Sequence, residues 1–239
     1  MLYKYTGIKY IPSCIENGVY ASQLDNINDP YEGKGIRYPE QYRVVCLTAS
    51  SLQMLMWAYY GNHKGCCVAF DVNYATPVEY IKEFQMHEDM STKEVIESLY
   101  QKGNEWKHEK EFRIVFHESK ANDPSWKRID ENIFLVAPVK KIVFGYLAEM
   151  DEKYVEMLEY IKEYNQNNEP IEVTKCRLKN EKYQLAEDKQ FDIDAELKRL
   201  VTFQNKETMK KSNSTQNNNF QGIVTGVEAF GKAIEKIHK

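Results

Sequence analysis

The stretch Glu109-Lys-Glu-Phe-Arg-Ile-Val-Phe116 decides the fold, because its residues alternate in character along the chain. Successive side chains of a strand point to opposite faces, so the alternation predicts a strand over residues 109–116. One face carries mostly apolar side chains, and we expect it to pack on the core: Lys110, Phe112, Ile114 and Phe116. The opposite face lines up three charged side chains: Glu109, Glu111 and Arg113.

The charged face of this strand has two interpretations. In the first, it is the solvated outer face of an antiparallel sheet, where neighbouring Glu and Arg side chains form weak ion pairs. In the second, a carboxylate stands at a cleft and is oriented by Arg113, while Trp106 and Lys107 form the wall of that cleft. The strand by itself leaves both interpretations open.

Apolar patterns on either side of this strand predict further elements. We expect strands at residues 2–5, 19–21, 43–47, 66–71, 133–136, 140–144 and 171–178, with residues 77–84 as a neighbour of 66–71. We expect helices at residues 11–16, 52–59, 91–102 and 151–164. Gly18 and Gly61 are the expected C-terminal ends of the first and second helices. The N-cap of the second helix is expected at Thr48, Ser50 or Ser51, and the third helix is expected to begin with a capping box between Ser91 and Glu94. No regular βαβ rhythm is present, which predicts an α+β fold with a mixed, largely antiparallel sheet core and flanking helices.

The chain length and composition suit one main domain. With 239 residues, of which 42% are hydrophobic, the chain can bury one sizeable core. We expect a single α+β domain over residues 1–203. Residues 204–219 are dominated by Ser, Asn, Gln and Lys and predict a polar linker. Residues 220–239 predict a short amphipathic helix or tail that could bind a partner or self-associate.

Charge and cysteine usage narrow the class of protein. The formal net charge is −4 and the pI is about 5.8, so no broad basic field is available to hold duplex nucleic acid or an anionic membrane. No apolar run reaches the roughly 20 residues that span a bilayer, and the first residues lack a signal-peptide pattern. Five cysteines without a Cys-x-x-Cys pair predict reduced thiols. We therefore expect a cytoplasmic protein.

The aromatic stretch at residues 55–65 is a second candidate for chemistry. It carries Trp57 and Tyr60 and ends in a glycine-bounded turn with His63 and Lys64. Large rings beside a cationic turn suit a nucleotide, whose base stacks and whose phosphates need positive charge. The alternative is a set of core aromatic residues followed by a solvated turn, which we favour for Trp57 itself.

Residues 28–32 form a polar loop with Asn28, Asp29 and Glu32 around Pro30. A purely structural role explains it well, because Asn and Asp side chains bond nearby backbone and proline fixes the turn. The histidines and cysteines form no zinc-site spacing, and we predict no metal. The sequence contains no glycine-rich phosphate loop and no Gly-x-Ser-x-Gly elbow.

Taken together, several ordered motifs resemble the microbial family known as domain of unknown function twenty-nine seventy-one. The matching stretches are residues 2–5, 28–32, 46–48, 55–60, 63–65, 70–71 and 106–113, covering roughly residues 2–145 with a weaker tail to about 185. The chain departs from that family at Leu47-Thr48, Tyr31 and Phe112, where the family usually has Phe-Ser, Phe and Trp. The resemblance implies that one site is lined by Glu109, Glu111, Arg113, Lys64, Trp57, Asn28, Asp29 and Glu32, and it brings no established reaction.

The arrangement is more distantly similar to ADP-ribosyltransferase-like toxins. That resemblance implies cleavage of the nicotinamide glycosidic bond of NAD, with Glu111, or Glu109 in its place, stabilising an oxocarbenium-like state. It further implies that Tyr5 and Thr48 position the ribose and that Trp57 or Tyr60 stacks on a ring. The usual Arg or His of the first strand is missing here, and Thr48-x-Ser50 only approximates the Ser-Thr-Ser stretch.

Three functions follow as hypotheses. The first is an ADP-ribosyltransferase-like enzyme that uses NAD as substrate, acting as a toxin or phage-defence effector on an unknown protein or nucleic-acid acceptor. The second is a metal-dependent nuclease in which Asp71 and Glu111-x-Arg113 imitate an Asp and Glu-x-Lys pattern. The third is a non-enzymatic nucleotide sensor or interaction module that signals through the tail at residues 220–238.

Overall fold

A computed structural model describes residues 1–83 and 90–203 of the chain. The chain divides into two compact units, Met1–Asp192 and Ile193–Lys239. In the second unit, the described residues 193–203 are helical. The expected linker at 204–219 and the expected tail at 220–239 lie outside the described residues. The first unit contains the described strands.

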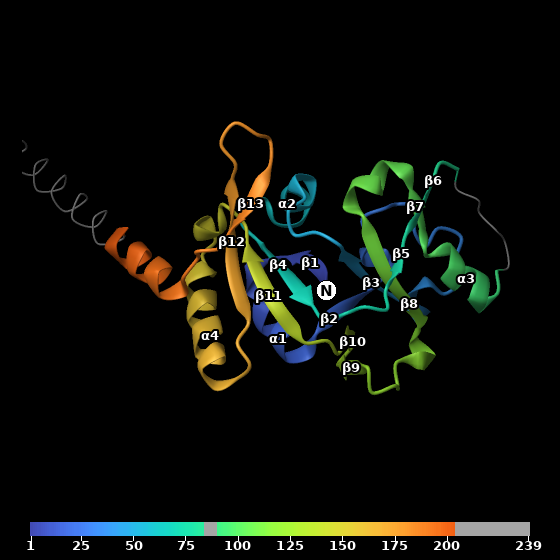
Figure 1. Cartoon of the computed structure of the whole chain (residues 1–239). Helices are drawn as coiled ribbons and strands as arrows, with labels where there is room; N and C mark the ends of the chain where they lie inside the picture. The colour runs from blue at the N-terminus through green and yellow to red at the C-terminus, as the bar shows by residue number, and fades with distance from the viewer. Residues whose placement is uncertain (84–89, 204–239) are drawn as a thin grey trace, which may run out of the picture. The chain divides into compact units, whose positions relative to one another are not determined.

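The first unit is built on a mixed sheet, which confirms the α+β class (Figure 1). Its strands follow the order β13-β12-β11-β4-β1-β3-β2-β10-β9, and β8 joins β3 and β5 off this path. Neighbouring strands are antiparallel except β11 and β12, and a separate small sheet pairs β6 with β7 in parallel. The strands are β1 (Leu2–Thr6), β2 (Val19–Gln23), β3 (Tyr42–Thr48), β4 (Cys66–Phe70), β5 (Thr76–Pro77), β6 (Glu79–Ile81), β7 (Gln101–Gly103), β8 (Glu111–His117), β9 (Trp126–Ile129), β10 (Asn132–Leu135), β11 (Val139–Phe144), β12 (Glu172–Leu178) and β13 (Leu185–Asp188).

The sheet divides between β1 and β3. These strands share one register pair, Tyr3 with Thr48, whereas β1 runs beside β4 for five residue pairs and β3 runs beside β8 for seven. Each side has its own group of buried side chains. On the β4 side they are Tyr5, Met56, Trp57, Cys67, Val143, Cys176 and Leu185. On the β8 side they are Leu24, Tyr42, Val44, Val95, Leu99 and Val115.

The helices flank this sheet much as the sequence predicts. They are α1 (Ile11–Asn17), α2 (Met54–Gly61), α3 (Thr92–Ser98) and α4 (Tyr154–Asn167), with a 3-10 helix η4 (Asn104–Glu109) before β8. The capping box between Ser91 and Glu94 is confirmed. Buried side chains of α4 include Tyr154, Leu158 and Ile161.

Several predicted helix ends are wrong. Gly61 lies inside α2, and Asn62 ends the helix with a left-handed φ of 48°. Gln53 precedes α2 as its N-cap residue, because Thr48 belongs to β3 and Ser51 donates its hydroxyl to Glu187. The helix expected to reach residue 102 ends at Ser98, and the chain enters β7 instead.

The prediction about which face of β8 packs inward is also wrong, except at Phe116, which is buried as expected. The strand begins at Glu111, after Lys110 takes a φ of 48°. Glu111, Arg113 and Val115 are buried, whereas Phe112 and Ile114 are half-buried. Side chains of α3 cover this face, which explains the burial of its charges. Residues 77–84 were expected beside β4, but β5 pairs with β8 and β6 pairs with β7.

Gly18 confirms the predicted end of α1 and provides a direct test. Its φ is 98°, and a Cβ atom there would lie 2.0 Å from the backbone oxygen of Leu135. We expect Gly18→Ala to lower the free energy of unfolding by at least about 2 kcal/mol, measured by urea denaturation. Gly7→Ala is the matched control, because Gly7 has an ordinary φ of −71° and a methyl group there would meet the Tyr10 ring at ordinary contact distances of 3.6 and 3.7 Å. Equal stabilities of the two variants would contradict this account.

Candidate functional site

A cavity of about 90 Å³ lies where β1 and β3 separate. Its wall comes from elements far apart in the sequence: Tyr3, Lys4 and Tyr5 of β1, Ser22 of β2, residues 26–28, Cys46, Leu47 and Thr48 of β3, Met56 and Tyr60 of α2, Lys102, Glu109 and Glu111. The volume leaves room for several waters or one small ring. Aromatic rings and charged groups together give the cavity an amphipathic lining.

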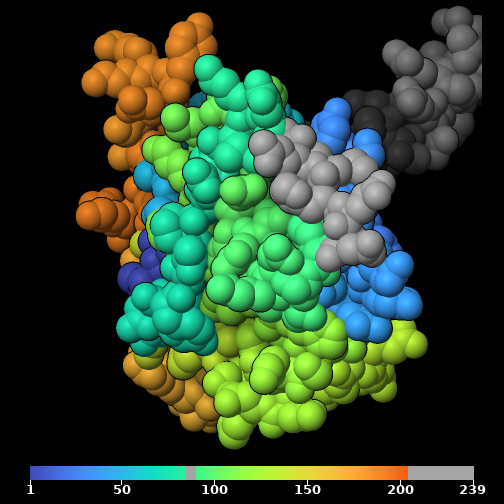
Figure 2. All heavy atoms as spheres, turned by 90° about the vertical axis from the view of Figure 1, so that its right-hand side faces the viewer, coloured from blue at the N-terminus to red at the C-terminus, as the bar shows by residue number. Residues whose placement is uncertain are grey.

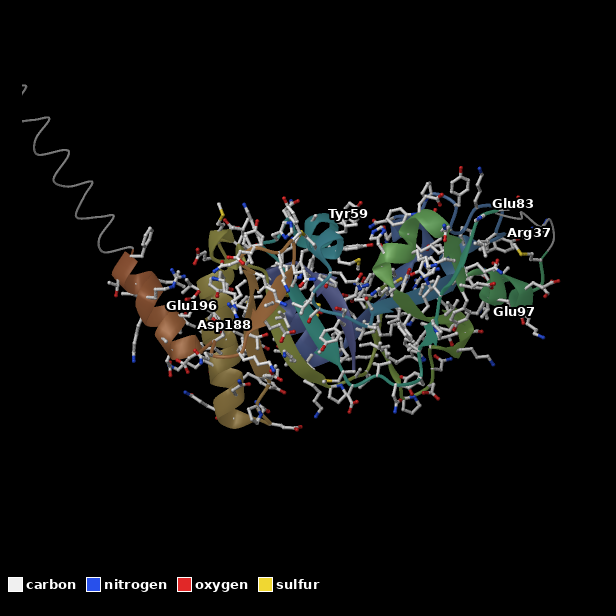
Figure 3. The ribbon with its side chains drawn as sticks, turned by 45° about the horizontal axis from the view of Figure 1, so that its top comes forward. Arg37, Tyr59, Glu83, Glu97, Asp188 and Glu196 are labelled. Carbon is white, nitrogen blue, oxygen red and sulfur yellow. The ribbon has the colours of Figure 1, made fainter. Side chains whose placement is uncertain are left out.

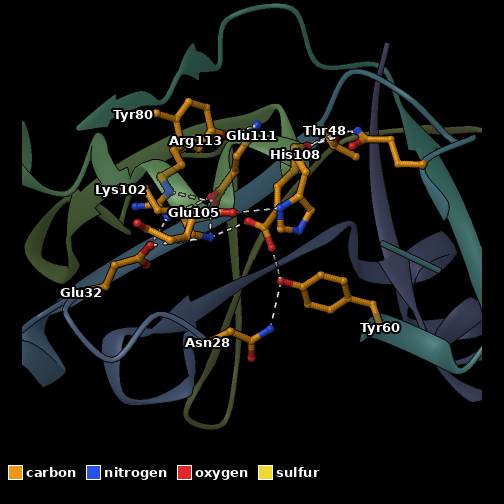
Figure 4. A network of polar contacts seen from close by, with 12 residues as sticks. Asn28, Glu32, Thr48, Tyr60, Tyr80, Lys102, Glu105, His108, Glu111 and Arg113 are labelled. Carbon is orange, nitrogen blue, oxygen red and sulfur yellow. Dashed lines mark hydrogen bonds and ion pairs between the residues drawn. The ribbon is translucent and has the colours of Figure 1, made fainter. Parts of the chain in front are cut away.

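The charged wall belongs to a buried cluster of three carboxylates and two cations (Figure 4). Lys102 Nζ lies 2.5 Å from Glu109 Oε2 and 3.0 Å from Glu111 Oε2. Arg113 donates from Nε to Glu111 Oε1 at 2.8 Å and from Nη2 to Glu32 Oε1 at 2.5 Å. Its Nη1 donates to the backbone oxygen of Leu99 at 2.7 Å, which fixes the guanidinium plane. The exposed fraction of each of the five side chains is 5% or less.

Burial and charge set the protonation states of the cluster. Burial alone would raise the pKa of Glu111, but Arg113 and Lys102 outweigh burial and hold this pKa at about 2. Burial would lower the pKa of Lys102, and the three surrounding carboxylates, Glu111 foremost, raise it instead. For Glu32, burial outweighs Arg113 and Lys102, and its pKa is raised. Glu111 is therefore an ionised carboxylate at neutral pH.

Hydrogen bonds from a second layer of residues hold the two cavity carboxylates in place. The hydroxyl of Tyr60 donates to Glu109 Oε1 and accepts from the Asn28 amide, both at 2.9 Å. Burial and the nearby Glu109 raise the pKa of Tyr60, so its hydroxyl stays protonated and can donate. The Thr48 hydroxyl donates to the backbone oxygen of Glu109 at 2.8 Å. The backbone N–H of Glu111 donates to the Tyr80 hydroxyl at 2.8 Å.

The structure brings most of the predicted site residues together. Around this cavity and its charged wall lie Glu109, Glu111, Arg113, Glu32, Asn28, Tyr60, Thr48 and Tyr5. The interpretation of the β8 charges as a solvated face is wrong, because Arg113 is fully buried and orients Glu111. Trp106 stands over Lys102, with the ammonium 4.8 Å from the ring centroid, but it lines a different cavity, and the wall expected from Trp106 and Lys107 is not the wall of this one.

Three predicted residues lie elsewhere. Trp57 is 1% exposed and donates its indole N–H to the backbone oxygen of Ser51, so it belongs to the core. Lys64 sits in the turn between α2 and β4 and does not line the cavity. Asp29 accepts the backbone N–H of Tyr31 and faces a different cavity.

Sequence reasoning missed Lys102, the residue that joins all three carboxylates. The capping box at Ser91 predicts a helix that includes residue 102. In the structure that helix ends at Ser98, and Lys102 lies in β7 with its side chain buried. Gln53 was also missed; its side-chain amide donates to Thr48 Oγ1 at 2.8 Å. A lysine four residues before Trp106 was the available signal for Lys102, but the direction of its side chain depends on strand pairing.

Comparisons of the chain with family models, curated proteins and solved structures found no match. Within residues 1–83 and 90–203, no helix is both long and apolar enough to cross a membrane. Among the same residues, no group of three or more His, Cys, Asp or Glu side chains is arranged to hold a metal ion. The two family resemblances therefore stay predictions.

The depressed pKa of Glu111 makes stability depend on pH. An acid whose pKa is lower in the folded state stabilises that state above its unfolded value, and the contribution disappears as pH falls through the folded value. We expect the Glu111 contribution to be lost between about pH 4.5 and about pH 2. Urea denaturation across this range should show a shallower decline for Glu111→Gln than for the parent.

Glu32 acts in the opposite direction, because protonation at its raised pKa favours the folded state, and the charge of Glu111 is one of the causes of that raised pKa. At pH 7, Glu111→Gln should lower the free energy of unfolding by about 3–5 kcal/mol, since it leaves a buried cation under-paired. The exposed Glu131 offers a control, Glu131→Gln, which should leave the curve unchanged. Parallel pH curves for Glu111→Gln and the parent would contradict the ionised state of Glu111.

Proposed function

We propose that the protein cleaves the bond between nicotinamide and ribose in NAD and transfers the ADP-ribose to an acceptor. One observation carries this proposal. Glu111 is an ionised carboxylate on the wall of a ring-sized cavity, and it accepts hydrogen bonds from the buried Arg113 and from Lys102, which lines the same cavity. A fixed negative charge of this kind is suited to a reaction in which positive charge develops on a bound sugar.

The chemistry places a specific demand on Glu111. When the C1′–N bond of NAD breaks, its electron pair goes to the nicotinamide nitrogen, and nicotinamide leaves as a neutral molecule. Positive charge then develops on the ribose, as in other glycosyl transfers. The acceptor's nucleophilic atom bonds to C1′ and releases a proton. Glu111 would stabilise the charged ribose, and Glu109, 2.5 Å from Lys102, is the second carboxylate at the same wall.

The cavity lining supports a modified set of roles for its other residues. Tyr60 is the predicted stacking ring that lines the cavity, so we assign the ring contact to Tyr60 and not to Trp57. Lys4 lines the cavity and takes the cationic role first considered for Lys64. The hydroxyls of Tyr5 and Thr48 already bond to backbone oxygens, so these residues shape the wall of the ribose subsite.

The nuclease hypothesis finds less support in the arrangement of the carboxylates. Asp71 follows β4, and the register runs from β4 through β1 and β3 to β8. Three strand spacings separate Asp71 from Glu111, a distance of about 14 Å or more, which is too far for one metal ion to bridge. The sensor hypothesis rests on residues 220–238, which lie outside the described residues.

The test is nicotinamide release from NAD by the purified full chain, with and without cell lysate as a source of acceptor. We expect release by the parent and a loss of roughly 10²–10³-fold in Glu111→Gln, the scale seen when one electrostatic contact to a transition state is removed. Nicotinamide release by Glu111→Gln at the rate of the parent would contradict the proposal. A parent protein that is folded but releases no nicotinamide, with or without lysate, would also contradict it.

Because Glu111→Gln is expected to be destabilised, a second pair of variants tests the site with the fold intact. Tyr60→Phe keeps the ring and removes the hydrogen bond to Glu109, and we expect about a tenfold decrease in release with the fold intact. Tyr59→Phe is its matched control on the same helix, because Tyr59 points outward and is 57% exposed (Figure 3). Equal activities of the two variants would remove Tyr60 from the site.

A further inference from the structure

Gln53 uses its side chain in a way that its place in the fold does not explain. It is the N-cap residue of α2, yet its side chain does not cap this helix. Residues at this position more commonly turn a short polar side chain back onto the free N–H groups of the first helical turn. The side chain of Gln53 reaches another part of the molecule, and its contacts there indicate its role.

The Gln53 amide lies against the backbone of η4, at the residue that supplies one of the cavity carboxylates. Its Nε2 donates to Thr48 Oγ1 at 2.8 Å and to the backbone oxygen of Glu109 at 3.2 Å. The Thr48 hydroxyl donates to the same backbone oxygen at 2.8 Å. Thr48 and Glu109 are each 2% exposed, so water has little access to replace a donor that is removed.

The backbone at Glu109 sets the direction of both cavity carboxylates. η4 ends at Glu109, Lys110 takes a left-handed φ of 48°, and Glu111 begins β8. A non-glycine residue in this conformation is strained and depends on surrounding contacts to hold it. η4 contacts both α2 and β7, and Figure 2 shows the side of the molecule on which β7 lies. Lys102 of β7 holds the carboxylate of Glu109, whereas Gln53 holds its backbone.

The backbone N–H of Gln53 makes a separate contact with β1. It donates to the Tyr5 hydroxyl at 3.1 Å, and that hydroxyl donates to the backbone oxygen of Ser50 at 3.0 Å. Tyr5 lines the first cavity, the one of about 90 Å³, as do Thr48 and Glu109. A substitution that removes only the side-chain amide of Gln53 leaves the bond to Tyr5 in place.

We propose that Gln53 is a positioning residue for the transfer of ADP-ribose, because its hold on the Glu109 backbone keeps Glu109 and Glu111 directed into the first cavity. This inference rests on the NAD reaction proposed above. Gln53 does not line the cavity, so its effect passes through the two carboxylates and not through contact with NAD. Small displacements of groups that stabilise a transition state slow a reaction strongly. Loss of the amide therefore lowers kcat and leaves KM nearly unchanged.

The experiment measures nicotinamide release by the full chain at varied NAD concentration, for the parent and for Gln53→Met. Methionine keeps the length of the side chain and removes its donor. We expect kcat to fall about tenfold while KM stays within about twofold of the parent. Gln53→Glu, which places an acceptor against the Glu109 carbonyl, should lower kcat further. Gln190→Met, the same substitution at an exposed glutamine, should match the parent.

A second measurement needs no NAD. The backbone N–H of Lys110 donates to the Lys107 oxygen, and that of Glu111 donates to the Tyr80 hydroxyl. In Gln53→Met, amide hydrogen exchange at Lys110 and Glu111 should become faster, while exchange in α4 and stability in urea stay as in the parent. Unchanged exchange at both amides would overturn the proposal. Faster exchange throughout α4 would also overturn it, because it would show a general loss of stability.

The two measurements separate failure of this inference from failure of the NAD reaction. If the parent releases no nicotinamide, the proposed reaction fails, and the role of Gln53 in it fails with it. If the parent is active and Gln53→Met has the kinetics of the parent, or a higher KM at unchanged kcat, the role of Gln53 alone fails.

Discussion

The ion pairs of the Lys102 ammonium hold the carboxylates of the site together. The ammonium lies within 4 Å of three carboxylates that come from a loop, a 3-10 helix and a strand. Together with Arg113, it makes the burial of three negative charges possible, because an unpaired buried ion typically costs several kcal/mol. The loop at residues 28–32, β7 and β8 must therefore be in place together. Two cavities with different linings meet at this one residue.

Local patterns predicted most of the fold correctly, because they depend on neighbouring residues alone. The capping box at Ser91 and the glycine end of α1 follow from backbone hydrogen bonding and from a positive φ that glycine tolerates. The inward face of β8 could not be predicted in this way. In a strand with charges on one side and apolar groups on the other, the apolar side is expected to pack on the core. Arg113 is buried instead, because the distant Glu32 pairs with it and Lys102 lies beside Glu32.

The candidate site was predictable as a set of motifs but not as a geometry. Asn28, Glu32 and Glu111 were singled out from the sequence, and the structure joins them through Tyr60, Glu109 and Arg113. The sequence cannot show which way an aromatic or lysine side chain points. Trp57 donates its indole N–H into the core, and Lys64 follows a helix that ends one residue later than expected.

The single register pair between β1 and β3 has a consequence for motion. Backbone hydrogen bonds are dense within each side of the sheet and sparse between them, so we expect the two sides to open as separate cooperative units joined at Tyr3 and Thr48. Amide hydrogen exchange can then differ between the units even though both belong to one continuous sheet. The first cavity lies on this boundary, and a molecule held there would tie the two units together. Slower exchange in both units at once would be the signature of occupancy, visible far from the molecule itself.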